Sequence, residues 1–433
     1  MSLNKKHSNN LVEFRLIFRA LRHRNYRLFF IGQGISLVGT WMQQIAMSWL
    51  VYRITNSVLL LGVVGFLGQL PTFILAPLAG VIADRHNRRR ILIFTQTLAM
   101  LQALVLSILV LTNNIEVWHI IVLSISLGVI SSFDIPVRQT FTVEMIEKRE
   151  DLGNAIALNS SMVNVARLIG PSLAGILIAT LGEGICFLLN SASYIAAILS
   201  LFLMRIVPRA IIPSDRDVLH HLKEGFIYAF NFIPIRAILI LLGLVSLMGV
   251  PYQLLMPVFA RDIFHGGPKT LGFLMAMSGT GALAGAIYLA GRKSVVGLGK
   301  IIAFASGLFG LGIIMFALSK VLWFSMAIMC IAGFAMMVQM AASNTVLQTI
   351  VEEDKRGRIM SFYTMSFMGM APFGSLLAGS LAHKIGAPNT LLLGGMCCII
   401  GAFVFIRKLP LLTEKMHPIY VSKGIIPEVT KKG

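Results

Sequence analysis

The chain has 433 residues, of which 56% are hydrophobic and only 13% are charged, and its formal net charge is +19. Soluble domains carry about 25% charged residues, so this composition excludes a soluble protein and indicates one embedded in a membrane. The positive charge is divided among short segments between apolar runs, which argues against nucleic acid as a partner and predicts contact with anionic membrane lipids. No cofactor, metal or enzymatic activity is expected, because the sequence contains no nucleophile–base pair and no metal-ligand spacing.

Twelve apolar runs predict an all-α membrane protein, because each is long enough to form the span of about 20 residues that a bilayer requires. No cleaved signal peptide is expected, since the first run follows a polar segment and is too long to be part of one. The runs lie at 29–52, 58–83, 91–111, 117–137, 160–181, 185–204, 237–260, 270–290, 300–319, 321–342, 359–383 and 388–406.

The polar segments around these runs divide the chain into five regions. We expect a basic N-terminal arm, a first six-helix bundle, a cytoplasmic linker, a second six-helix bundle and a cytoplasmic tail. The arm carries apolar residues at helical spacing among arginines, so it forms either a helix on the inner membrane face or a solvated tail. The linker mixes charged and apolar residues, which predicts an amphipathic helix. The five regions are 1–27, 28–205, 206–235, 236–407 and 408–433.

A short basic segment joins the second and third runs, and short loops rich in Lys and Arg stay in the cytoplasm. The segment contains Gly80, Asp84, Arg85, Arg88, Arg89 and Arg90. It resembles the signature loop between helices 2 and 3 of the major facilitator superfamily, Gly-x-x-x-Asp-Arg-x-x-Arg-Arg, at every required position. The resemblance implies twelve transmembrane helices in two pseudo-symmetric six-helix bundles, transport by alternating access, and a gate role for Asp84. In the alternative interpretation, Asp84 is a loop acid neutralised by Arg88 or Arg89.

One acid and one base lie inside predicted spans, where a charged side chain is costly. Asp134 lies near the end of the fourth span and Arg167 lies at a similar depth in the fifth, so the two could form an ion pair. Arg138 follows Asp134 by one helical turn and is a competing partner. The Asp134–Arg167 pair has either a structural role or a role in coupling or substrate binding.

Three segments are similar to the enterobactin-exporter branch of the superfamily, which also contains macrolide-efflux-like pumps. They are Gly39-Thr-Trp41-Met42-Gln43, Asp134-Ile-Pro136-Val-Arg138-Gln139, and a fifth-span motif containing Asn159, Asn164, Arg167, Gly170, Pro171 and Gly175. The Gly170-Pro171 run also resembles the antiporter signature of helix 5, although Ala174 stands where the fuller motif has a second glycine.

These resemblances imply a multi-pass exporter of the inner (plasma) membrane, driven by proton antiport. Its substrate would be a siderophore or a drug-like amphiphile, so siderophore export and multidrug resistance are the expected roles, and a monomer is expected. A lysophospholipid flippase-like carrier is one alternative. A non-transporting membrane sensor or scaffold is another, although a scaffold would need neither a gate loop nor intramembrane charges.

Polar side chains inside the spans are candidates for the substrate cavity, because lipid-facing amides are unfavourable. For each of them, hydrogen bonding between helices is an equally good explanation. The candidates are Gln43, Gln69, Asn190, Tyr194, Gln253 and Gln339. Prolines in the spans predict kinks or half-helix breaks, and they are Pro71, Pro136, Pro171, Pro251 and Pro372.

The two halves of the chain are related by an internal duplication. A shift of 204 positions aligns 140–182 with 344–386 without a gap, and four of the eight identical positions are glycines. The same shift places Asp84 on Tyr288. The second half has therefore lost the acid of the signature loop, and we expect the loop to act asymmetrically.

The distribution of basic residues predicts the orientation. If both termini are cytoplasmic, 31 of the 37 Lys and Arg residues lie in cytoplasmic segments and five lie in outer loops. Short basic loops remain on the cytoplasmic side, so both ends of the chain are expected there.

Overall fold

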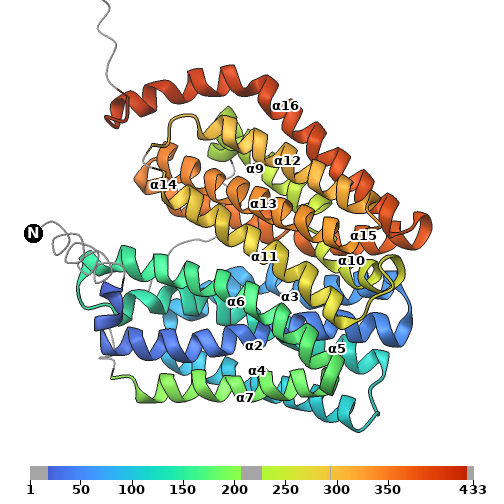
Figure 1. Cartoon of the computed structure of the whole chain (residues 1–433). Helices are drawn as coiled ribbons and strands as arrows, with labels where there is room; N and C mark the ends of the chain where they lie inside the picture. The colour runs from blue at the N-terminus through green and yellow to red at the C-terminus, as the bar shows by residue number, and fades with distance from the viewer. Residues whose placement is uncertain (1–17, 206–226, 293, 427–433) are drawn as a thin grey trace, which may run out of the picture. The chain divides into compact units, whose positions relative to one another are not determined.

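The computed structural model describes residues 18–205, 227–292 and 294–426, and this part of the chain is almost entirely helical and contains no strand (Figure 1). Eleven helical stretches are long and apolar enough to cross a membrane. The expected first span lies in α2 (Arg24–Thr55), which is continuous over 32 residues but is not among these eleven. The prediction of an all-α membrane protein is confirmed.

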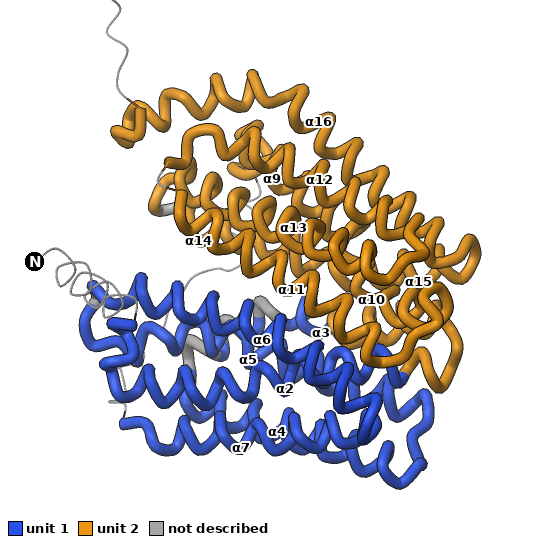
Figure 2. Tube along the Cα trace, in the orientation of Figure 1, with its two compact units in different colours: residues 1–50, 70–214 blue, residues 51–69, 215–433 orange. Residues whose placement is uncertain are grey.

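The chain divides into two compact units, which are described separately (Figure 2). Unit 1 comprises residues 1–50 and 70–214. Within it, α4 packs against α5 and α7, and a cluster of buried apolar side chains around Tyr26, Leu92 and Phe141 joins the helix ends. Its elements are η1 (Arg19–Arg22), most of α2, the second part of α3 (Val58–Arg85), α4 (Arg88–Leu111), α5 (Val117–Phe141), η2 (Thr142–Met145), η3 (Arg149–Asp151), α6 (Leu152–Leu181) and α7 (Glu183–Leu203).

Unit 2 comprises residues 51–69 and 215–433. In this unit α11 and α13 pack with their backbones in contact, because a Cβ atom on Gly281 would lie 1.8 Å from the Cys330 carbonyl oxygen. Its elements are the end of α2, the first part of α3, α9 (Ile233–Leu244), η4 (Val245–Gly249), α10 (Tyr252–Val258), η5 (Phe259–Ile263), α11 (Pro268–Ala290), α12 (Leu298–Leu318), α13 (Leu322–Ile350), α14 (Glu353–Met368), α15 (Ala371–Ile385) and α16 (Ala387–Ser422).

Prolines have unequal effects on these helices. The eleventh expected span is broken into α14 and α15 just before Pro372, whereas α5 and α6 continue through Pro136 and Pro171. A kink or a half-helix break was expected at each of these prolines, and no break occurs at Pro136 or Pro171. A helix in a bundle can continue through a proline when neighbouring groups satisfy the freed backbone carbonyl.

The ends of the chain also differ from expectation. The last helix, α16, continues through the first part of the expected tail as far as Ser422. The N-terminal arm and the linker helix fall mostly outside the described residues, which begin at Phe18 and omit 206–226.

Candidate functional site

The signature loop forms a tight turn between α3 and α4. The first helix ends at Arg85 and the next begins at Arg88, and the side chain of Asn87 caps α4 by accepting a hydrogen bond from the Arg90 backbone nitrogen at 3.2 Å. The side chains of Asp84 and Arg85, and the surroundings of Gly80, lie outside the described part of the structure. The gate role of Asp84 therefore stays a prediction.

Two arginines of the loop connect this turn to other parts of unit 1. Arg88 forms an ion pair with Glu144 in η2. Arg89 donates from Nε to the Leu201 carbonyl at 2.7 Å and from Nη2 to the Phe202 carbonyl at 2.9 Å. These are among the last carbonyls of α7, which lack partners within their own helix. A cation at this end also interacts favourably with the helix dipole.

Asp134 lies in a polar cluster between α4 and α5. Its Oδ1 atom accepts hydrogen bonds from Thr95 Oγ1 at 2.9 Å and Gln96 Nε2 at 2.8 Å. Its Oδ2 atom lies 3.5 Å from Arg138 Nη2, and the Asp134 side chain is 10% exposed. Asp134 thus contacts the competing partner, Arg138, rather than Arg167.

The guanidinium of Arg167 lies over the ring of Trp41 on α2, with 5.0 Å from Cζ to the ring centroid. A cation over an indole face is attracted by the negative charge of that face. One turn further along α6, Gly170 allows close approach, because a Cβ atom there would lie 2.5 Å from Trp41 Cβ and 3.0 Å from the Val38 carbonyl oxygen. Gly170 and Arg167 therefore both position α6 against α2.

The remaining polar residues of the α6 motif also make local structural contacts. Asn159 Nδ2 donates to Thr142 Oγ1 at 3.1 Å, and its Oδ1 accepts from the Tyr26 hydroxyl at 3.1 Å. Asn164 Nδ2 donates to the carbonyl oxygen of Ser160, one turn earlier in α6, at 2.9 Å. Pro171 and Gly175 are buried within the same helix.

Two of the candidate cavity residues belong to a buried network in unit 1. Asn190 Nδ2 donates to Gln43 Oε1 at 2.6 Å, and Gln43 Nε2 donates to Gln102 Oε1 at 3.1 Å. Gln102 in turn donates to the Leu123 carbonyl at 3.2 Å. Gln43 is 3% exposed and Asn190 is fully buried. For these two residues the structure supports hydrogen bonding between helices.

The other four candidates have different surroundings. Tyr194 is buried, and its hydroxyl lies 3.5 Å from that of Thr40. Gln69 is exposed and donates to the backbone of its own helix. Gln253 donates to the neighbouring Tyr252 hydroxyl at 3.3 Å. Gln339 is 1% exposed, and neither its Nε2 nor its Oε1 has a hydrogen-bond partner among the described residues.

A set of contacts at one end of unit 2 was not found from the sequence. The Tyr52 hydroxyl, near the end of α2, donates to the Asp262 carboxylate in η5. Arg261 Nη1 donates to Asn56 Oδ1 at 2.6 Å, and the Arg261 guanidinium lies 5.7 Å from the Tyr52 ring centroid. The π-helical geometry of η5 presents Arg261 and Asp262 together, and such bulges are frequent at functional sites.

The same region contains a close backbone contact between α3 and α15. A Cβ atom on Gly62 would lie 2.8 Å from Gly379 Cα. The orientation predicted from the charge pattern would place this end of unit 2 outside the cell. Four residues therefore form what we call the outer contact set: Tyr52, Asn56, Arg261 and Asp262. The sequence carried only a weak signal for it, a charged pair within an otherwise apolar run.

The segment that precedes α2 is anchored to the start of α6. Ala20 N donates to Asn154 Oδ1 at 2.9 Å. His23 Nε2 lies 2.9 Å from Asp151 Oδ2, and Arg19 forms an ion pair with the same carboxylate. The hydrogen bond with His23, assisted by the nearby Arg19 charge, holds the pKa of Asp151 below its ordinary value.

Comparison with known proteins identifies the family of this chain and several similar proteins. The model of the transmembrane secretion effector family, within the major facilitator superfamily, matches residues 17–423. A staphyloferrin A transporter of Staphylococcus aureus is 30% identical, over 91% of this chain and 99% of its own. Macrolide efflux protein A of Streptococcus pyogenes is 23% identical, over 90% and 99%. An enterobactin exporter of Citrobacter koseri is 24% identical, over 93% and 96%.

Solved structures show the fold. The crystal structure of the nucleoside transporter NupG superposes with a TM-score of 0.71, covering 89% of this chain and 99% of that one, at 10% identity. At this identity the likeness concerns the fold alone.

Proposed function

Since the chain belongs to the transmembrane secretion effector family of the major facilitator superfamily, a group of non-enzymatic transporters, we propose that it exports a siderophore or a drug-like amphiphile in exchange for protons. Relatives that span nearly the whole chain are named for siderophores and for macrolide efflux, which supports export of a small molecule. In this proposal the protein works as a monomer in the plasma membrane, with both termini in the cytoplasm.

The observation that supports alternating access is the outer contact set. It consists of two hydrogen bonds, from Tyr52 to Asp262 and from Arg261 to Asn56, and of one cation–π contact between Arg261 and Tyr52. Such contacts can be exchanged for water at little net cost, unlike an interlocked apolar core. We propose that they break each time substrate leaves on this side and form again afterwards.

The experiment is a reversible cross-link across this contact. Asn56→Cys and Arg261→Cys are introduced into a protein lacking its four native cysteines and are joined by a short, cleavable bifunctional thiol reagent. Export should stop when the link is made and recover when it is cleaved. The matched control links Ser319→Cys to Ser325→Cys, two hydroxyls 2.7 Å apart between α12 and α13, which should leave export unchanged. Continued export by the protein linked at 56 and 261 would overturn the proposed movement.

Proton coupling is assigned to Asp134. It is an acid on a transmembrane helix, and a buried carboxylate near a cation is suited to taking up and releasing a proton. Thr95 and Gln96 hold one carboxylate oxygen, while Arg138 faces the other.

A further inference from the structure

The last helix continues well beyond the membrane span. The apolar run ends at Ile406, but α16 remains helical to Ser422. The segment 407–422, called here the α16 extension, buries one face and exposes the other. Lys423, directly after it, donates from Nζ to the Thr349 carbonyl at 2.6 Å and to the Val351 carbonyl at 3.3 Å at the end of α13. The buried residues recur at helical spacing: Leu409, Leu412, Met416 and Tyr420. The extension is therefore docked on unit 2 and is amphipathic.

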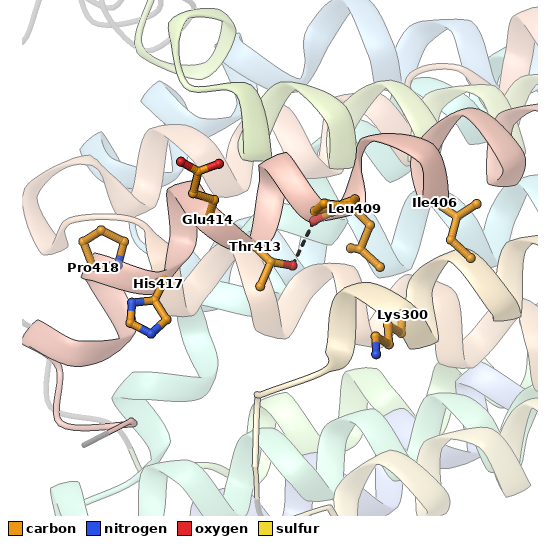
Figure 3. A pocket seen from close by; sticks show the side chains of 8 residues that line it. Lys300, Ile406, Leu409, Thr413, Glu414, His417 and Pro418 are labelled. Atoms are coloured by element: carbon orange, nitrogen blue, oxygen red, sulfur yellow. Dashed lines mark hydrogen bonds between the residues drawn. The ribbon is translucent and has the colours of Figure 1, made fainter. Parts of the chain in front are cut away.

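A groove of about 580 Å³ lies between the α16 extension and the first turn of α12 (Figure 3). Apolar walls come from Ile406, Leu409, Pro410 and Pro418, and polar ones from Lys300, Thr413, Glu414 and His417. A Cβ atom on Gly299 would lie 2.7 Å from Leu409 Cδ1, so the two helices are in contact at the floor of the groove.

The charges around the groove favour an anion. Lys300 is exposed and makes no ion pair or hydrogen bond with the described residues. Residues 407–423 contain four basic side chains and one acid, Glu414. In Figure 3 the Glu414 carboxylate projects to the opposite side of α16 from the His417 ring and the Lys300 amine. Glu414 lines the groove as well, but among the described residues it forms no ion pair with Lys300 or His417.

The position of the groove indicates which anion would occupy it. The groove lies where the apolar run ends, and the charge pattern assigns this end of α12 and α16 to the cytoplasm. Basic pockets at the cytoplasmic ends of transmembrane helices meet anionic lipid headgroups. The adjacent apolar wall matches the glycerol and upper acyl region of a lipid, which a small soluble anion lacks.

We propose that this groove binds the headgroup of an anionic phospholipid of the inner leaflet. Lys300 and His417 contact the phosphate, and Ile406 and Leu409 pack against the start of the acyl chains. The site is separate from the export function, because it is lined by α12 and α16 of unit 2 and uses none of the residues assigned to gating or coupling.

The test measures phosphatidylglycerol binding to the purified full-length protein by native mass spectrometry in detergent. Lys300→Gln should weaken binding about fivefold, the effect of removing one basic residue near anionic lipid. Lys300→Arg should retain binding, because the charge is kept. The matched control is Lys320→Gln, an exposed lysine just beyond the other end of α12, which should leave binding unchanged.

Three results would overturn the proposal. Equal losses for Lys300→Gln and Lys320→Gln would mean that lipid binds by general charge and not in the groove. Equal binding of phosphatidylethanolamine and phosphatidylglycerol would show that the groove does not select an anion. Competition by inorganic phosphate at low millimolar concentration would show that the site holds a soluble anion and not a lipid.

Discussion

The two copies of the internal duplication fold differently at the same position in the repeat. In unit 1, α6 is one continuous helix, whereas the corresponding stretch of unit 2 is divided into α14 and α15. The broken copy has Gly369 and Pro372 within one turn, at the positions of Val165 and Leu168. A glycine weakens a helix and a proline removes a hydrogen bond from it, so this pair favours a break between α14 and α15. The adjacent Gly170 and Pro171 do not end α6, which packs closely against α2 at this point.

The glycines behave alike in the two copies. Gly170 packs against the Val38 carbonyl oxygen at 3.0 Å, and Gly374 packs against that of Leu247 at 2.6 Å, both measured from an added Cβ. Gly182 and Gly386 both end their helices with φ values of +83° and +85°, which favour glycine. Close approach and chain reversal were therefore retained in the duplication, while helix continuity was not.

Charged and polar networks differ more strongly between the units. The shift of 204 positions brings Asp134 onto Val338 and Arg138 onto Ala342, both buried and apolar. Gln43 of unit 1 forms hydrogen bonds through both Nε2 and Oε1, whereas neither atom of Gln339 in unit 2 has a partner among the described residues. At these repeat positions the ionisable side chains are confined to unit 1, and four experiments test how far this asymmetry extends.

The largest effect is expected at the signature loop. Asp84→Asn should abolish export at normal protein levels, because only the first copy retains the gate carboxylate. Tyr288→Phe, at the corresponding position of unit 2, should export like the wild type. Efflux from cells with matched expression measures both variants. Full export by Asp84→Asn would contradict the gate role predicted for Asp84.

The Asp134 cluster comes next. Arg138→Gln leaves a carboxylate without its cation and should cost about 3 kcal/mol of stability, while neutralising both residues should recover much of this loss. If Asp134 carries the proton, the double variant Asp134→Asn/Arg138→Gln is stable but does not export. Thermal unfolding and efflux are compared for the single and double variants.

Arg167→Gln provides the control for this pair. Because Arg167 stacks on Trp41 and Asp134 faces Arg138, the stability losses of Arg167→Gln and Asp134→Asn should add. Recovery of stability in the Asp134→Asn/Arg167→Gln variant would mean that these two residues are coupled after all. Recovery of export by the variant lacking Asp134 and Arg138 would show that the cluster is only structural.

The two buried glutamines form a matched pair for the third test. Gln43→Leu leaves Asn190 and Gln102 without their hydrogen bonds to Gln43, and it should lower the free energy of unfolding by about 1–3 kcal/mol. Gln339→Leu removes an amide with no described partner and should be neutral or stabilising. Thermal unfolding of both variants in one detergent measures the two stabilities. Equal losses of stability would contradict the predicted difference between the two glutamines. Reduced export by a stable Gln339→Leu variant would assign this amide to substrate.

The smallest effect concerns acid stability. The pKa of Asp151 is lowered in the folded protein, so the carboxylate contributes stability above its ordinary pKa of 3.8, and this contribution is lost as the pH falls through the lowered value. Asp151→Asn should therefore unfold more easily than the wild type at neutral pH. The two melting curves, measured against pH, should converge below about pH 4. A constant difference down to the lowest pH would contradict the Asp151–His23 contact as its cause.

The sequence by itself determined the class of protein and most of the spans. The run expected at 91–111 is α4 (Arg88–Leu111), and the run at 270–290 is α11 (Pro268–Ala290). These predictions succeed because a bilayer requires about 20 apolar residues per span, wherever the span lies in the fold. The signature loop and the fifth-span motif likewise indicated the family before any geometry was known, because they are short patterns with set spacing.

Only the tertiary structure decided which polar groups meet. Counting residues placed Asp134 and Arg167 at similar depths, but depth does not say which way a side chain faces around its helix. Arg138 shares the α5 face of Asp134, while Arg167 lies against Trp41 of α2. The bonds from Gln43 to Asn190 and from Tyr52 to Asp262 join residues 147 and 210 positions apart. Such pairings depend on the rotation and packing of whole helices, which a single sequence does not specify.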